Sequence, residues 1–177
     1  DWPGLGASGP GAAPERTGPR TGRPVREMSD LLTPAAGSIG PDHIHRLPVR
    51  VYYEDTDFSG VVYHARYLHF FERGRTESLR ACGIHHSELA AMTPSLAFAV
   101  RRMSVEFVRA ARVDDVLVVG TGFRPQVGAR LMMEQTIHRA DELVASATVE
   151  AVCIDSSGRA KRPPAWMRDR WRSYLLD

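Results

Sequence analysis

The hydrophobic pattern of the chain changes from the period of a strand to that of a helix, and then changes back. Val49, Val51 and Tyr53 alternate with polar neighbours, which predicts a half-buried strand over residues 48–53. Between residues 64 and 82 apolar side chains recur every three or four positions, as on the buried side of a helix. Gly83 suits the left-handed position that ends helices. The pattern predicts a strand followed by one long helix.

The residues after this helix predict four more strands. Alternation over residues 94–107, with a phase shift near Arg101 and Arg102, predicts a strand that bends there. Three further apolar runs are joined by short loops and predict an antiparallel meander: residues 116–124, 129–139 and 143–154.

Two shorter helices complete the pattern. Residues 85–91 predict a helical turn with Ser87 as its cap, and Pro163 and Pro164 predict the start of a C-terminal amphipathic helix. The whole order is that of an α+β fold, in which one antiparallel sheet wraps the apolar side of the long helix.

Residues 1–47 differ in composition from the rest. They hold seven of the 12 prolines and eight of the 15 glycines, and such a segment buries too little apolar surface to offset its ordering entropy. We therefore expect a disordered leader over residues 1–47 and one folded domain over residues 48–177, with Met28 as an alternative start of the chain.

Charge and cysteine content narrow the class of protein. The net charge is +2 and no basic stripe interleaved with aromatic residues is found, so nucleic acid is not an expected partner. No stretch approaches the ~20 apolar residues of a membrane span, and no signal peptide is found, so we expect a cytoplasmic protein, with attachment to the inner membrane surface as an alternative. Cys82 and Cys153 lack metal-ligand spacing and are expected to be buried free thiols.

The candidate chemistry lies in the turn before the long helix. Residues 54–60 contain Asp55, Asp57, Ser59 and Gly60, all of which favour turns. The first amides of the following helix are free and partly positive, so they can hold an oxygen anion. A carboxylate beside such an anion site is the smallest set of groups that can hydrolyse an acyl compound.

The same residues carry a resemblance to a known family. The segments concerned are YYEDTD (52–57), GVVYH (60–64), YL (67–68), ER (72–73), RTE (75–77) and RMSVEF (102–107). They resemble hotdog-fold acyl-CoA thioesterases of the 4-hydroxybenzoyl-CoA thioesterase superfamily, and most closely its YbgC-type branch, which is associated with the Tol-Pal system.

The resemblance implies a hotdog fold, with an antiparallel sheet of five or six strands wrapped around a central helix. It also implies a homodimer or homotetramer with its active sites at the dimer interface. The implied substrate is acyl-CoA, with acyl carrier protein as a further potential partner, and the reaction needs neither metal nor organic cofactor.

The resemblance also assigns roles to residues. Asp57, His64 and Tyr53 fall on catalytic positions, and a backbone amide near His64 polarises the thioester carbonyl. The residues that fall on substrate-binding positions are Gly60, Val61, Val62 and Tyr63. Asp57 either attacks the carbonyl directly or deprotonates the attacking water.

Other roles for these residues stay open. Asp57 can instead cap free amides, whereas Asp55 is expected to hold the turn. His64 acts as a base, contacts the substrate or shapes the helix start, and Tyr53 is either a site residue or a core residue. Glu72 is the rival carboxylate, although its spacing to neighbouring arginines is typical of ordinary helical ion pairs.

Further side chains are weaker candidates. Four arginines can either clasp coenzyme A phosphates or remain solvated: Arg101, Arg102, Arg109 and Arg130. Four apolar residues can line an acyl site or pack in the core: Phe98, Met103, Met132 and Met133. The alternative functions are a non-catalytic protein that binds acyl carrier protein or a Tol-Pal component, and a hotdog enoyl-CoA hydratase.

Overall fold

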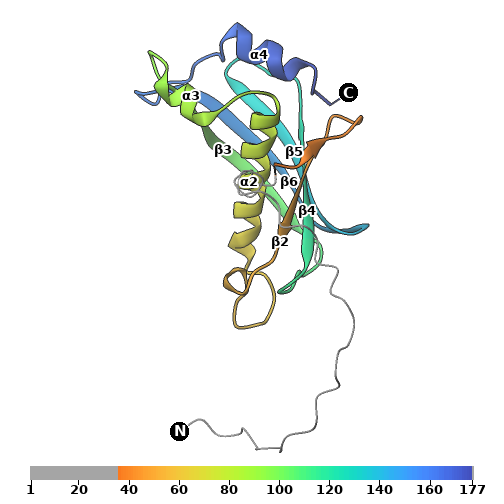
Figure 1. Cartoon of the computed structure of the whole chain (residues 1–177). Coiled ribbons are helices and arrows are strands. Elements are labelled where there is room, and N and C mark those ends of the chain that lie inside the picture. The colour runs from red at the N-terminus through yellow and green to blue at the C-terminus, as the bar shows by residue number, and fades with distance from the viewer. Residues whose placement is uncertain (1–35, 177) are drawn as a thin grey trace, which may run out of the picture. The chain divides into compact units, whose positions relative to one another are not determined.

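The computed structural model describes residues 36–176 and shows a six-stranded antiparallel sheet with a long helix, α2, along one face (Figure 1). The elements are β1 (Ser38–Ile39), β2 (His45–Arg50), the 3₁₀ helix η1 (Tyr53–Asp55), α2 (His64–Ala81), α3 (His86–Ala91), β3 (Leu96–Phe107), β4 (Val116–Phe123), β5 (Arg130–Arg139), β6 (Glu142–Asp155) and α4 (Ala165–Arg172). The strand order is β1-β2-β4-β5-β6-β3. The predicted α+β hotdog fold, with its C-terminal helix, is confirmed.

The four later strands lie where the alternation predicted them, to within two residues at each end. The register of β3 against β6 shifts between Val100 and Arg102, which confirms the predicted bend. Because β4, β5 and β6 pair in sequence through short loops, they form the predicted meander.

The first strand is the main correction. It was predicted over residues 48–53, but β2 begins at His45, ends at Arg50 and pairs with β1 on one side and β4 on the other. The predicted boundary at residue 47 therefore falls inside β2. Most of the predicted leader, residues 1–35, lies outside the described residues, as does Met28.

Helix α2 confirms the predicted face. Its buried residues are Tyr67, Phe70, Phe71, Gly74, Arg75, Ser78 and Leu79, whereas Leu68 is exposed. Gly74 has no side chain, so the helix can approach β4 closely: a Cβ added there would lie 2.7 Å from Val119 Cγ1. Gly83 has a φ of +71°, as a helix-ending glycine should.

The shorter elements and the cysteines complete the comparison. Helix α3 exists, but its N-cap is His85 and no side chain caps it, so the predicted role of Ser87 is wrong. Cys82 and Cys153 are buried free thiols, as predicted, and burial raises the pKa of Cys82 to about 11. Among the described helices, none has both the length and the apolar character needed to cross a membrane.

Candidate functional site

The turn between β2 and α2 closes on itself and exposes Asp57. The Asp57 amide donates to the Val61 carbonyl at 3.0 Å, and the Gly60 amide donates to the Asp57 carbonyl at 2.9 Å. Gly60 has a φ of +75°, which glycine adopts without a steric penalty. The backbone of the turn therefore fixes where the Asp57 side chain starts.

One oxygen of the Asp57 carboxylate is engaged and the other is free. Oδ1 accepts hydrogen bonds from the Ser59 hydroxyl and from the Ser59 amide, the latter at 2.8 Å. Oδ2 has no hydrogen-bond partner within residues 36–176. The Ser59 hydroxyl and then the Ser59 amide lower the pKa of Asp57 below its ordinary value, and His64 adds a smaller effect. Asp57 is therefore ionised at neutral pH.

Asp55 has a different environment and a different role. It is buried, and its Oδ2 accepts the Tyr52 amide at 2.8 Å while its Oδ1 lies 3.6 Å from Arg66 Nε. Its carbonyl accepts the Tyr63 amide at 2.9 Å. Asp55 thus ties the turn to the first turn of α2, which confirms the prediction that it holds the turn.

The N-terminus of α2 carries unsatisfied amides directly after this turn. Its N-cap, Tyr63, makes no side-chain capping bond, and the first helical turn contains no acidic residue. The Val62 amide is occupied by the Ala111 carbonyl at 2.8 Å, but the His64 and Ala65 amides have no acceptor in the described part of the chain. Free amides at a helix N-terminus favour a negatively charged oxygen.

A groove of about 340 Å³ opens beside these amides. It is lined by Val62, His64, Tyr67, Phe107, Val108, Arg109 and Ala110. The Phe107 ring lies edge-on to the Tyr67 ring, with centroids 5.4 Å apart, and the Tyr67 hydroxyl accepts the Ala111 amide at 3.0 Å. The groove is mostly apolar and places His64 at the helix start.

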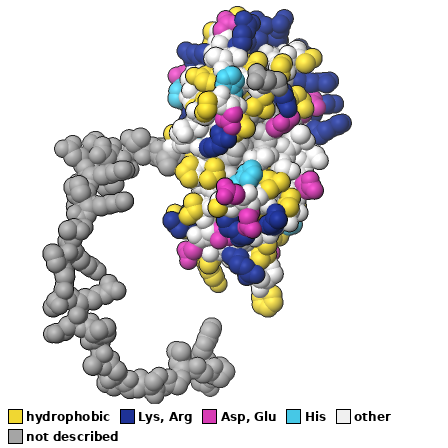
Figure 2. Space-filling model, turned by 90° about the vertical axis from the view of Figure 1, so that its right-hand side faces the viewer, with side chains coloured by type: hydrophobic (Ala, Val, Ile, Leu, Met, Phe, Trp, Pro, Cys, Tyr) yellow, Lys and Arg dark blue, Asp and Glu magenta, His cyan; other side chains and the backbone are white. Residues whose placement is uncertain are grey.

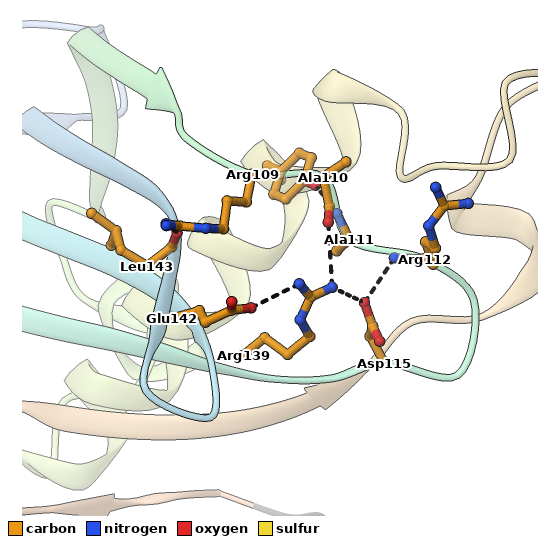
Figure 3. A network of polar contacts seen from close by, with 9 residues as sticks. Arg109, Ala110, Ala111, Arg112, Asp115, Arg139, Glu142 and Leu143 are labelled. Carbon is orange, nitrogen blue, oxygen red and sulfur yellow. Dashed lines mark hydrogen bonds and ion pairs between the residues drawn. The ribbon is translucent and has the colours of Figure 1, made fainter.

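A network of polar contacts fixes the segment that forms one side of this groove (Figure 3). The Arg139 guanidinium donates to Asp115 at 2.9 Å and to Glu142 at 2.8 Å, which joins the segment before β4 to the β5–β6 hairpin. The same segment contains Ala111, whose carbonyl accepts the Val62 amide. The network therefore helps to position the chain just before α2.

The structure places Tyr53 differently from the sequence prediction. Tyr53 does not end a strand; it begins η1, and its side chain is 86% exposed. The Asp55 carboxylate accepts a hydrogen bond from the Tyr52 amide, and the 3₁₀ helix η1 forms at this point. The alternation of apolar and polar side chains therefore ends at Val51. The Tyr63 ring instead packs beside His64, with centroids 4.3 Å apart.

The rival carboxylate, Glu72, is held by its own helix. It pairs with Arg75 at 2.5 Å and accepts the Thr76 hydroxyl at 3.2 Å, as the predicted ion-pair spacing suggested. Glu72 also borders a small cavity of about 40 Å³ lined in part by Phe98 and Met133. These two apolar candidates therefore share a cavity, whereas Met103 and Met132 do not line it.

Three of the four candidate arginines are engaged by protein groups. Arg101 and Arg130 both lie within ion-pair distance of Glu150, at 2.7 and 3.3 Å, and Arg109 donates to the Leu143 carbonyl at 3.1 Å. Arg102 makes no side-chain hydrogen bond or ion pair among residues 36–176, although its charge helps to lower the pKa of Glu150. Of the four, Arg109 lies in the groove beside α2.

The sequence did not reveal how three residues contribute to the turn and to the groove. Ser59 was taken as a turn former, but it also holds the Asp57 carboxylate, which the two-residue spacing could have indicated. Tyr67 and Phe107 looked like ordinary apolar positions and instead line the groove. No sequence signal distinguishes these two from core residues.

Comparison with known proteins identifies the class. Residues 51–171 match the family model described as the thioesterase-like superfamily, and the chain belongs to that family. Together with the relatives described below, this makes the protein a thioester hydrolase and confirms the resemblance seen in the sequence.

The individual relatives point to a narrower group within this family. The acyl-CoA thioesterase YbgC of Haemophilus influenzae is 46% identical over 114 residues, which are 64% of this chain and 83% of that protein. The acyl-CoA thioester hydrolase YbgC of Escherichia coli O6:H1 is 48% identical over 113 residues, which are 63% of this chain and 83% of that protein. A solved probable thioesterase from Bartonella henselae is 45% identical with a TM-score of 0.67, and the match covers 68% of this chain and 99% of that chain. The sequence is thus similar to the YbgC proteins.

Proposed function

We propose that this protein hydrolyses the thioester of acyl-CoA to a free acid and coenzyme A, with Asp57 as its catalytic carboxylate. The names of the two YbgC relatives support this substrate class. The observation that carries the proposal is the pairing of an ionised Asp57, with one free oxygen, and the unoccupied His64 and Ala65 amides at the start of α2. These are a carboxylate and an oxyanion site in adjacent segments.

The mechanism follows from these two groups. The free amides withdraw electron density from the acyl carbonyl and stabilise the oxyanion that develops on it. Asp57 then either attacks the carbonyl carbon to give a mixed anhydride, which water cleaves, or accepts a proton from the attacking water. The carbon–sulfur bond breaks and the thiolate of coenzyme A leaves without needing a strong acid. His64 contacts the substrate carbonyl or shapes the helix start.

A second copy of the chain would complete the site. Large apolar side chains are exposed around the catalytic turn and the groove: Tyr52, Tyr53, Phe58, Tyr63, Phe107 and Val108. Strand β3 is the last strand in the sheet order, so its outer edge has no partner strand in the described part of the chain. Both features support a homodimer, or a tetramer of two dimers, in which Tyr53 and Phe58 meet the partner subunit.

The test is a thiol-release assay on short-chain, long-chain and aromatic acyl-CoA substrates. Asp57→Asn keeps the size of the side chain but removes its charge, so we expect kcat to fall by about 10²- to 10⁴-fold while KM changes little. Circular dichroism and melting temperature check that the variant remains folded.

Asp141→Asn is the matched control, because Asp141 is exposed in the β5–β6 turn and its side chain makes no hydrogen bond or ion pair within the described residues. It should retain full turnover. Near wild-type activity of Asp57→Asn would remove Asp57 from the mechanism. If the wild-type protein cleaves no acyl-CoA, capture of acyl carrier protein or hydration of an enoyl-CoA becomes the better description.

A further inference from the structure

A cavity of about 250 Å³ lies beside α4 and is separate from the catalytic turn. It is lined by Pro125, Gln126, Arg162, Arg168, Trp171, Arg172 and Leu175. Its walls therefore come from the β4–β5 loop, from α4 and from the residues on either side of α4. The residues after α4 are fixed there, since the Leu176 amide donates to the Phe123 carbonyl at 2.8 Å.

Helix α4, which lines this cavity, lies at the opposite end of α2 from the turn that contains Asp57 (Figure 1). Helix α4 is anchored just past the end of α2 by a hydrogen bond from the Arg170 guanidinium to the Gly83 carbonyl. At 1.5 Å per residue the 18 residues of α2 span about 27 Å. Within one protomer, a ligand in this cavity is therefore far from the Asp57 carboxylate.

The arginines that line the cavity face little opposite charge within residues 36–176. No acidic residue of that part of the chain lines the cavity, and Arg168 Nε is inaccessible to solvent and has no hydrogen-bond partner there. The guanidinium of Arg162 also has no partner among residues 36–176, and that of Arg172 reaches only Asp169, at 3.8 Å on the exposed surface. An unsatisfied buried donor on a charged group costs free energy, and arginine side chains that line a cavity without a facing carboxylate favour a bound anion.

The electrostatics of helix α4 explain only some of the arginines that it carries. Cations near a helix C-terminus are favourable, which suffices for Arg170 and Arg172. It does not account for Arg168, whose side chain turns inward beside Trp171 and lies one helical turn before Arg172. Like charges at that spacing repel each other. Lys and Arg side chains also gather at the end of the molecule where α4 lies (Figure 2).

We propose that this cavity binds the phosphate group of a phosphate monoester, with Arg168 and Arg172 as its main ligands and Arg162 at its rim. A planar guanidinium donates two parallel hydrogen bonds to a phosphate, and such charge-assisted bonds are the stronger kind. The phosphate can come from a soluble nucleotide, such as the 3′-phosphorylated end of coenzyme A, or from a phospholipid headgroup. Both sources present the same chemistry to the cavity.

Calorimetric titration of the full-length protein tests the proposal without any turnover. The probes are inorganic phosphate, adenosine 3′,5′-bisphosphate and vesicles containing phosphatidic acid. We expect saturable binding that weakens with salt, and about tenfold or greater loss of affinity in both Arg168→Gln and Arg172→Gln. Arg80→Gln is the control, because Arg80 is an exposed arginine that pairs with Glu77 on α2; it should bind as the wild type does.

The arms of the experiment separate the sources. Tighter binding of adenosine 3′,5′-bisphosphate than of inorganic phosphate assigns the site to a nucleotide, and vesicle binding displaced by inorganic phosphate assigns it to a lipid headgroup. Absence of saturable binding by every probe overturns the proposal. Binding that Arg168→Gln and Arg172→Gln leave unchanged also overturns it, as does vesicle binding that soluble phosphate does not displace. Because no thioester is cleaved, these results are independent of the role of Asp57.

Discussion

Two aspartates separated by one residue have opposite tasks in this turn. Asp55 is buried and satisfied by the Tyr52 amide and Arg66, whereas Asp57 is exposed and keeps one oxygen free. The difference depends on Ser59, whose amide and hydroxyl both point at the same oxygen of Asp57. Ser59 therefore fixes the orientation of the carboxylate and lowers its pKa at the same time.

Removal of the Ser59 hydroxyl should move the acid limit of activity. Ser59 holds the pKa of Asp57 below its ordinary value of 3.8, so the ionised form persists to lower pH than usual. Ser59→Ala removes the largest cause of that shift, so the acidic limb of the kcat/KM profile should move to higher pH. The measurement is thiol release across the acidic range, with circular dichroism to confirm folding at each pH.

A serine in another turn provides the comparison for that profile. Ser156 is exposed and its hydroxyl makes no hydrogen bond within the described residues, so Ser156→Ala should leave the limb in place. An acidic limb that is the same in Ser59→Ala and in the wild type would mean that Ser59 does not control the ionisation of Asp57.

At the level of single residues, the sequence predicted the turn-holding role of Asp55 but misplaced Tyr53. Spacing and turn chemistry suffice for Asp55, because its contacts are local. Tyr53 continued the alternation of Val49 and Val51, but the pattern ends at Val51. The Val51 amide donates to the Asp115 carbonyl at 2.9 Å, and η1 begins where the Asp55 carboxylate accepts the Tyr52 amide. A contact over more than sixty positions cannot be read from a local period.

Among the elements, α2 depends on one small residue for its distance from the sheet. Gly74 faces Val119, Thr121 and Gln135, and the buried Gln135 amide donates to the Phe71 carbonyl at 3.0 Å and to Thr121 at 2.9 Å. The helix is therefore packed closely against β4 and hydrogen-bonded to β5 at this point.

Gly74→Ala should destabilise the protein even though alanine favours helices. The gain in helix propensity is about 1 kcal/mol, but the new methyl would lie 2.7 Å from the buried Val119 side chain, and such overpacking costs about 1–3 kcal/mol. We expect a net loss of up to about 2 kcal/mol in the free energy of unfolding, measured by urea denaturation.

The control for this substitution is Arg80→Ala on the same helix, an exposed position whose side chain forms a surface ion pair with Glu77, so stability should change by no more than about 0.5 kcal/mol. A Gly74→Ala variant as stable as the wild type would show that α2 can move away from β4 at little cost.

The elements also show where periodicity fails. Helix α2 and strands β3 to β6 are long, and their patterns predicted them well. The start of strand β2 was predicted too late because His45 looked like part of a polar leader. His45 is in fact buried, and its Nε2 bonds the Ala36 carbonyl at 2.8 Å. Pro48, where the predicted strand began, lies beyond the short pairing with β1 and so needs no amide on that side.

The two ends of α2 carry different surfaces across the whole molecule. Exposed aromatic and apolar side chains surround the turn that contains Asp57 at the N-terminal end, whereas arginines surround α4 at the C-terminal end. The first surface suits another copy of the chain and the second suits an anion. Sequence alone could suggest the dimer only through resemblance, because neither exposure nor the open edge of β3 follows from a local pattern.

If a second copy completes the active site, activity must depend on protein concentration. Dilution below the dissociation constant of the dimer should lower turnover per protomer, because a lone subunit leaves the catalytic turn and Phe107 open to water. Analytical ultracentrifugation at matched concentrations identifies where the dimer dissociates. Excess Asp57→Asn protein added to diluted wild-type protein should restore activity, since it supplies the partner surface without a catalytic carboxylate. Serum albumin added at equal mass should not restore activity. If turnover per protomer stays constant at concentrations where only monomer sediments, the active site is not shared between subunits.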